Sequence, residues 1–165
     1  MIVRNLIKAC LSAFLAALCI MGSPAVLAEA VEQRIWLTVV DPGDGSQCEV
    51  WALFKGDQDN CKNDAAKGRS DCSKEEGCVC TRKEKKVQWS MDKGGDKNKE
   101  PFSIVFNQGS DNPFVQKGSN ECNFKSNKEG NLRCRVKGKE VSKGIYRYSV
   151  EVPHCRPLVT HIKVY

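Results

Sequence analysis

The chain has 165 residues, with 26 Lys and Arg against 20 Asp and Glu, a formal net charge of +6 and ten cysteines. A chain of this length suits one domain with one hydrophobic core. The mild positive charge is less than a nucleic-acid-binding face requires, so we expect no nucleic-acid partner. The many cysteines point away from the reducing cytoplasm.

The N-terminal segment has the pattern of a secretory signal peptide. Two basic residues precede an apolar stretch at residues 11–21, which is shorter than a typical membrane span, and small residues follow it. Cleavage fits after Ala28 or, as the alternative, after Ala30. We therefore expect residues 1–28 to be a signal peptide, and the mature protein to be secreted or periplasmic with no transmembrane segment. Cleavage takes two of the 26 Lys and Arg and no acidic residue, which leaves a net charge of +4.

Along the mature chain, apolar and polar residues alternate in seven short runs separated by Gly, Asn, Asp and Lys. Alternation with period two is typical of half-buried, antiparallel β-strands. The runs are residues 34–41, 48–54, 87–91, 102–107, 132–136, 145–152 and 158–164. About seven such strands predict that residues 31–165 form a single all-β domain, a two-layer Greek-key sandwich of cupredoxin-like or Ig-like type.

Two polar segments interrupt the strand pattern. Residues 56–77 are charged and hold two cysteines, and residues 92–100 consist of Asp, Lys, Gly, Asn and Glu. We expect both to be long loops at the rim of the sandwich, where binding function is commonly carried, although solvated tethers explain them as well. The best helix candidate, residues 60–67, is short and polar.

Eight cysteines remain after cleavage, and an even number in a small exported chain predicts a disulfide framework. They are Cys48, Cys61, Cys72, Cys78, Cys80, Cys122, Cys134 and Cys155. Cys122 and Cys134 flank a turn-like segment and would close a hairpin. The pair Cys61 and Cys72 would tie off a polar loop. The other four would cross-link strands, with one bridge fastening the C-terminal end. No Cys-x2-Cys pair is present, which disfavours zinc.

The Cys78-Val79-Cys80 segment has two interpretations. A reactive thiolate needs positive charge nearby, and Arg82 and Lys83 follow closely, so thiol exchange is one of them. The other is structural, with two bridges that leave one strand towards opposite faces. We favour the structural interpretation.

Several motifs in the second half of the chain stand out. They are Val87-Gln88-Trp89-Ser90, residues 101–106, Asn112-Pro113-Phe114, residues 144–150 and residues 158–165. In strand rhythm and aromatic placement, this half resembles small exported bacterial proteins with a cupredoxin-like β-sandwich, over about residues 85–165. The resemblance implies a Greek-key sandwich. It implies no function, because this fold serves many.

Copper binding is the function that this resemblance first suggests, and it needs two His, one Cys and usually one Met. Here His161 follows Cys155 by six residues, His154 is adjacent to Cys155, and no Met follows Met91. The ligand pattern of the family is not matched. We therefore expect no metal and no cofactor, with Cys155 in a disulfide and both histidines at the surface, His161 pointing away from Ile162.

Basic residues form the candidate binding surface. One group is a charged run beside a strand, and the other would share the outward faces of two neighbouring strands if these form a hairpin. The candidates are Arg82, Lys83, Lys85, Lys86, Arg133, Arg135 and Arg147. Such a face holds a polyanion such as lipopolysaccharide, an acidic glycan or a negatively charged protein patch. The alternative is a solvated sheet face whose edge lysines discourage aggregation.

Motifs of hydrolytic enzymes are missing from the sequence, which has two histidines in all and neither Gly-x-Ser-x-Gly nor His-Glu-x-x-His. The sequence therefore predicts a non-enzymatic exported protein that binds another protein, for example as an inhibitor, or an envelope or host surface. The alternatives are a secreted toxin or effector, and a redox or metal protein that uses Cys78, Cys80, Cys155 and His161.

Overall fold

The structure is a computed structural model that describes residues 31–54, 61, 76–92, 100–107, 111–116 and 122–165. The expected signal peptide at residues 1–28 lies outside the described residues. So do most of the two polar segments at 56–77 and 92–100, and the helix candidate at 60–67 apart from Cys61.

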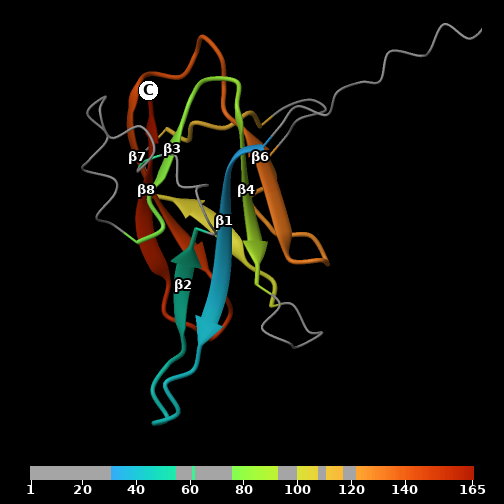
Figure 1. Ribbon diagram of the computed structural model, residues 1–165, viewed down its shortest axis with the longest axis vertical. Coiled ribbons are helices and arrows are strands. Elements are labelled where there is room, and N and C mark those ends of the chain that lie inside the picture. Colours follow the sequence, from blue (N-terminus) through green and yellow to red (C-terminus); the bar gives the residue numbers. More distant parts are fainter. Residues whose placement is uncertain (1–30, 55–60, 62–75, 93–99, 108–110, 117–121) are drawn as a thin grey trace, which may run out of the picture.

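Two four-stranded sheets face each other and make the chain an all-β sandwich (Figure 1). The first sheet has the order β2-β1-β4-β6, with β1 at Val31–Val40, β2 at Glu49–Leu53, β4 at Lys86–Met91 and β6 at Asn131–Arg135. The second sheet has the order β3-β8-β7-β5, with β3 at Val79–Thr81, β5 at Ser103–Phe106, β7 at Gly144–Glu151 and β8 at Leu158–Val164.

All seven predicted strands are confirmed, and their ends differ from the predicted ones by at most three residues. The eighth strand of the described residues, β3, was not among the seven alternating runs, because its three residues are all buried and show no alternation. The expectation of purely antiparallel pairing was wrong, since β1 pairs with β4 and β3 pairs with β8 in parallel. Alternation reports which face of a strand is buried and says nothing about the direction of its neighbour.

The core lies between the sheets and takes the apolar face of every predicted strand. Ile35, Leu37 and Trp89 are fully buried. Each large apolar side chain buried in this way contributes about 1.5–3 kcal/mol relative to an exposed one. The Trp89 ring meets the rings of Phe114 and Tyr148 edge to face, with centroids 5.7 and 5.9 Å apart. This aromatic centre joins the two sheets, because Trp89 belongs to the first and Tyr148 to the second.

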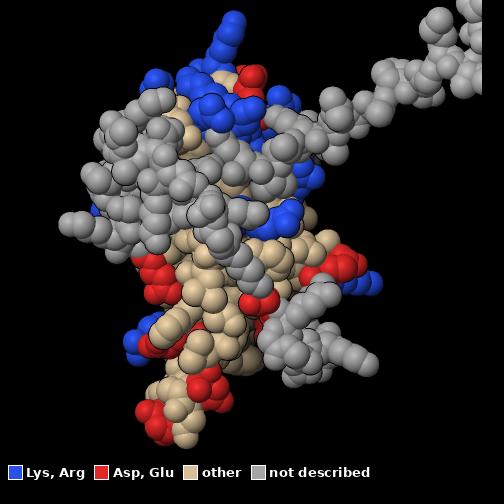
Figure 2. All heavy atoms as spheres, viewed as in Figure 1, with Lys and Arg blue, Asp and Glu red and all other residues tan. Residues whose placement is uncertain are grey.

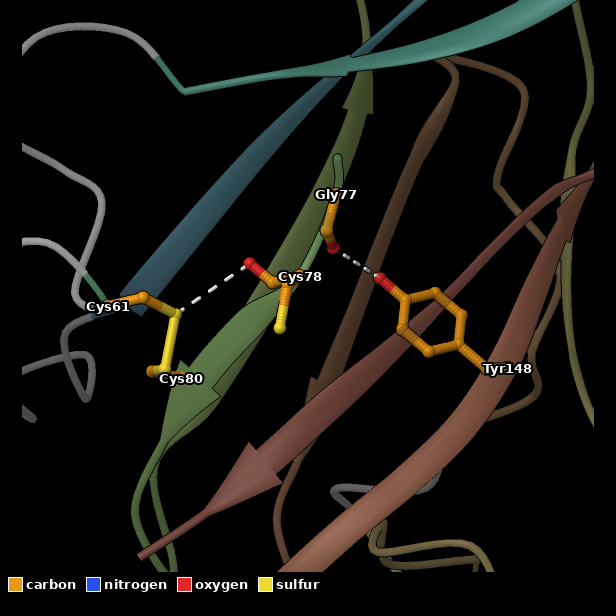
Figure 3. Close-up of a disulfide and its surroundings, with 5 residues drawn as sticks. All are labelled: Cys61, Gly77, Cys78, Cys80 and Tyr148. Atoms are coloured by element: carbon orange, nitrogen blue, oxygen red, sulfur yellow. Dashed lines mark hydrogen bonds between the residues drawn. A yellow bond between two sulfur atoms is a disulfide. The ribbon is translucent and has the colours of Figure 1, made fainter. Parts of the chain in front are cut away.

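Three disulfides connect described residues. Two of the sequence-based expectations are confirmed. The predicted hairpin bridge is Cys122–Cys134, and the predicted bridge that fastens the C-terminal end is Cys48–Cys155. The proposed pairing of Cys61 with Cys72 was wrong, because Cys61 is bonded to Cys80 (Figure 3). Position in one polar loop suggested that pair, but the fold brings Cys61 beside β3 instead.

The Cys78-Val79-Cys80 segment also corrects an expectation. Cys78 is disulfide-bonded as well. Cys78 and Cys80 lie in one small buried cluster with Cys61, while Val79 faces the main core. The two bridges therefore do not leave the strand towards opposite faces, because side chains two residues apart on a strand share a face.

Candidate anion-binding surface

Two turns meet at one end of the sandwich. The β3–β4 turn, residues 82–85, and the β6–β7 connection, residues 136–143, both cross from one sheet to the other there. The backbone N–H of Val136 donates to the carbonyl of Lys85 over 2.8 Å, and the N–H of Glu84 donates to the carbonyl of Val136 over 3.2 Å. These backbone bonds fix the two turns against each other as one platform.

The platform is rich in positive charge. We define the basic end as residues 82–86, 135–143 and Lys163, which contain nine Lys and Arg against two Glu. The basic residues are Arg82, Lys83, Lys85, Lys86, Arg135, Lys137, Lys139, Lys143 and Lys163. Figure 2 shows Lys and Arg side chains gathered at the top of the view.

The opposite end carries most of the described acidic side chains. They are Asp41, Asp44, Glu49, Asp92, Glu129 and Glu151, at or beside the strand ends there. Hydrogen bonds from Ser46, of which the backbone N–H donates over 2.9 Å, hold the pKa of the Asp44 carboxyl below its usual range. Asp44 therefore stays ionised at neutral pH, and charge is segregated along the long axis of the sandwich (Figure 2).

The structure brings together five of the seven predicted binding residues. Arg82, Lys83 and Lys85 lie in the β3–β4 turn, and Lys86 lies directly opposite Arg135 across the β4–β6 pair. Two like charges opposite each other on neighbouring strands destabilise the pairing slightly.

Arg133 lies one step further along β6, opposite Gln88. Arg147 is separated from this group. It would share a face with Arg133 and Arg135 if β6 and β7 formed a hairpin, but these strands belong to different sheets. It lies instead on β7, opposite His161 of β8. The expectation that Arg133, Arg135 and Arg147 share one basic face was therefore wrong.

Four basic residues of this end were missed by the sequence analysis. They are Lys137, Lys139, Lys143 and Lys163. Three of them follow β6 within a short connection, so the Lys-Gly-Lys spacing beside the predicted strand was the signal that could have found them. Lys137 is anchored, because its ammonium donates to the carbonyl of Asn112 over 2.8 Å, whereas Lys139 and Lys143 are exposed.

The two histidines differ in exposure. His154 is exposed, as expected. His161 alternates with the core residues Thr160 and Ile162 as predicted, but it is only 5% exposed, so its assignment to the surface was wrong. Alternation gives the direction in which a side chain points, and a position pointing away from the core is not always open to solvent.

The redox and metal alternatives depend on cysteines that are bonded in this structure. Cys78, Cys80 and Cys155 are all in disulfides, so none of them carries a thiolate here. Within the described part of the chain, no three His, Cys, Asp or Glu side chains lie close enough to hold a metal ion. In the same residues no helix is long and apolar enough to cross a bilayer.

The described residues also line two shallow hollows, of about 180 and 210 Å³. The smaller lies between β2 and β8 beside Trp51 and Arg156, and the larger lies beside Phe102 and Pro153. Pockets for drug-sized ligands have volumes of about 300–1,000 Å³. Both described hollows are smaller than such pockets.

Comparison with known proteins adds little about function. No protein family matches the sequence, and no curated protein matches it either. Among solved structures, the McoA multicopper oxidase of the hyperthermophile Aquifex aeolicus is similar at 12% identity and a TM-score of 0.32, over 82% of this chain and 27% of that one. This chain thus spans about a quarter of the oxidase, and we carry nothing of the oxidase's activity over to it.

Proposed function

We propose that this chain is an exported, non-enzymatic binding protein that recognises an acidic partner through its basic end. The partner is another protein, which the chain would inhibit, or an envelope or host surface. The observation that carries the proposal is the gathering of nine Lys and Arg on two hydrogen-bonded turns and the strand ends beside them. Three disulfides support an oxidising, extracellular setting for it.

The physical argument is one of steering and rigidity. A surface of one sign attracts an oppositely charged partner during diffusional encounter, and this attraction weakens as salt is added. Turns that are held by backbone hydrogen bonds and by disulfides lose little conformational freedom on binding.

The other functions suggested by the sequence have less support. A redox or metal protein would need thiolates where Cys80 and Cys155 form disulfides. A secreted toxin or effector stays a prediction that no feature of the fold favours.

The test uses poly-L-glutamate, a polyanion without sugar or phosphate. Binding of the mature protein should weaken steeply as salt rises. Replacing Lys139 and Lys143 with Glu should weaken it at least about tenfold, because two attractive charges become repulsive. The matched control replaces Lys125 and Lys128, which are equally exposed but lie at the other end of the sandwich.

The control double variant has the same net charge as the test variant and should lose less than about twofold. Equal weakening by the two double variants would mean that net charge alone drives binding. That result would overturn the assignment to the basic end.

A further inference from the structure

The side of the first sheet that faces away from the core carries an unusual combination of side chains. On this outer face the residues of neighbouring strands form rows, because their register places them opposite one another. One row contains Leu53 of β2, Trp36 of β1 and Ser90 of β4. The next row contains Arg34 of β1, Gln88 of β4 and Arg133 of β6.

The first of these rows belongs to an exposed apolar area. Leu53 is 44% exposed, and its neighbour Trp51 on the same edge strand is 45% exposed. Trp36 is half-buried beside them. The indole N–H of Trp51 donates to the carboxylate of Glu49 over 3.3 Å, which holds the ring on the surface.

The second row is basic and polar. Its strand positions lie about 7 Å from the aromatic row, the rise of two residues. The Arg34 guanidinium lies over the Trp36 ring, 5.9 Å from its centroid, and so connects the two rows by a cation–π contact. One further step along β4 and β6 stand Lys86 and Arg135, which belong to the basic end. The outer face therefore changes from aromatic side chains, through the Gln88 amide, to strongly basic side chains.

We infer that this outer face binds an acidic polysaccharide, a glycan chain with carboxylate or sulfate groups. Aromatic rings offer flat apolar area to the C–H faces of sugar rings. The half-buried amide of Gln88, which donates to the buried Ser90 hydroxyl over 3.0 Å, suits sugar hydroxyls with its remaining hydrogen-bonding groups. Guanidinium groups bind carboxylate and sulfate through paired hydrogen bonds. The inference rests on the proposed function, because the basic end forms the charged margin of this face, and it names the class of partner.

A single-stranded nucleic acid is the other polyanion that uses aromatic rings and arginine. The disulfides favour the glycan, because they suit an extracellular setting in which acidic polysaccharides are common polyanions. The mild net charge of the chain, +6 with the predicted signal peptide and +4 without it, is also less than a nucleic-acid-binding domain usually carries.

The test titrates the mature protein with a heparin oligosaccharide and follows tryptophan fluorescence. Of the three tryptophans, Trp89 is fully buried, so a change on binding reports on Trp36 and Trp51. We expect a saturable change in emission. Separately, Trp51→Ser and Arg133→Gln should each weaken binding about five- to tenfold. Val105→Ser is the matched control, because Val105 is 40% exposed on β5 of the second sheet and lies outside the basic end, and it should have no effect.

The outcomes separate this inference from the proposed function. Weakening by the Lys139 and Lys143 substitutions without any effect of Trp51→Ser would leave the basic end in place and overturn the glycan face. No weakening by either set would overturn both. Equal affinity for neutral dextran, or tighter binding of an oligothymidylate that depends on Trp51, would also overturn the assignment to an acidic polysaccharide. Far-UV circular dichroism checks that Trp51→Ser, a change at an exposed position, leaves the fold intact.

Discussion

At the scale of single residues, the hydroxyl of Tyr148 links the two sheets by hydrogen bonds. It accepts a hydrogen bond from the Trp89 indole N–H over 3.3 Å and donates to the carbonyl of Gly77 over 3.1 Å (Figure 3). Tyr148→Phe would leave a buried donor and a buried acceptor unpaired. We expect it to lower the free energy of unfolding by about 1–3 kcal/mol, measured by urea denaturation.

Tyr146 on the same strand provides the control. Its hydroxyl donates to the carbonyl of Ser142 over 2.8 Å in an exposed setting, where water replaces the partner. Tyr146→Phe should therefore cost less than about 1 kcal/mol. Equal losses in the two variants would contradict the role assigned to Tyr148.

The same hydroxyl predicts a response to alkaline pH. Burial raises the pKa of Tyr148 above its ordinary value of 10. A pKa that is higher in the folded than in the unfolded state gives stability that is fully present below about pH 10 and is lost as the pH rises above it. Between about pH 10 and the raised pKa, one such group lowers the free energy of unfolding by about 1.4 kcal/mol per pH unit.

The measurement compares unfolding free energies between pH 8 and 11.5 in the wild type and in Tyr148→Phe. The variant should lose stability less steeply above pH 10, whereas lysine titration affects both proteins alike. Burial also raises the pKa of Tyr146, which remains in both. Parallel curves for the two proteins would show that Tyr148 is not the group responsible.

Gly77 is a second position where one side chain decides stability. Its φ of +70° is a conformation that L-residues rarely adopt, and an added Cβ would lie 3.1 Å from the Ala52 Cβ and 3.2 Å from the Leu158 Cδ2. We expect Gly77→Ala to cost about 2–3 kcal/mol, from backbone strain and crowding together. Gly43→Ala is the control. Its φ of +74° imposes the same strain, but the added Cβ would have nothing within 4 Å, so we expect about 1 kcal/mol.

The sequence predicted that Tyr148 and Trp89 are buried, but it did not predict which residues they contact. Alternation placed Tyr148 and Trp89 in the core, which the structure confirms. The hydrogen bond from Tyr148 to Gly77 joins residues 71 positions apart, and no local sequence motif indicates it. Such contacts follow from how the sheets stack, and periodicity within one strand carries no information about that.

At the scale of elements, the disulfides differ in the length of chain that each of them closes into a loop. Cys48–Cys155 connects the start of β2 to the turn before β8 across a sequence separation of 107 residues. Cys122–Cys134 spans 12 residues. In the chain-entropy account, a longer closed loop restricts the unfolded chain more.

Replacement of each pair by serine should therefore have unequal effects. We expect the Cys48→Ser and Cys155→Ser double variant to lose about 4–5 kcal/mol, and the Cys122→Ser and Cys134→Ser double variant about 3 kcal/mol. Thermal unfolding of both proteins under oxidising conditions measures the difference. A larger loss for the shorter loop would show that local packing, and not restriction of the unfolded chain, sets the contribution of these bridges.

Strands with one buried face could be predicted from the sequence, because their apolar and polar residues alternate, whereas a strand without this alternation could not. The seven alternating strands were found, but β3, with all three residues buried, was not. The hairpin pair Cys122–Cys134 was predictable because the bridge is local. Cys61–Cys80 was not, because the fold determines which segment lies beside β3.

At the scale of the whole molecule, the sandwich separates charges that are mixed along the sequence. The charged run at residues 82–86 predicted part of the basic end. Lys139 and Lys143 also lie there because the β6–β7 connection crosses between the sheets at the same end as the β3–β4 turn. Arg147, which the sequence suggested on equal grounds, is placed elsewhere by the same topology. Composition therefore predicted the sign of the surface, and only the topology showed where it gathers.

This segregation makes the orientation of the bound protein measurable. A polyanion that occupies the basic end should shield the exposed amines of Lys139 and Lys143 from an acylating reagent and leave Lys125 and Lys128 reactive. Lys137 is unsuitable as a reporter, because its ammonium already donates to the Asn112 carbonyl. We expect severalfold slower acetylation at Lys139 and Lys143 with poly-L-glutamate, measured by peptide mass spectrometry, and recovery of the rate at high salt because screening weakens the contact. Uniform protection of all four lysines would indicate a diffuse ion cloud, and preferential protection of Lys125 and Lys128 would place the binding surface at the opposite end.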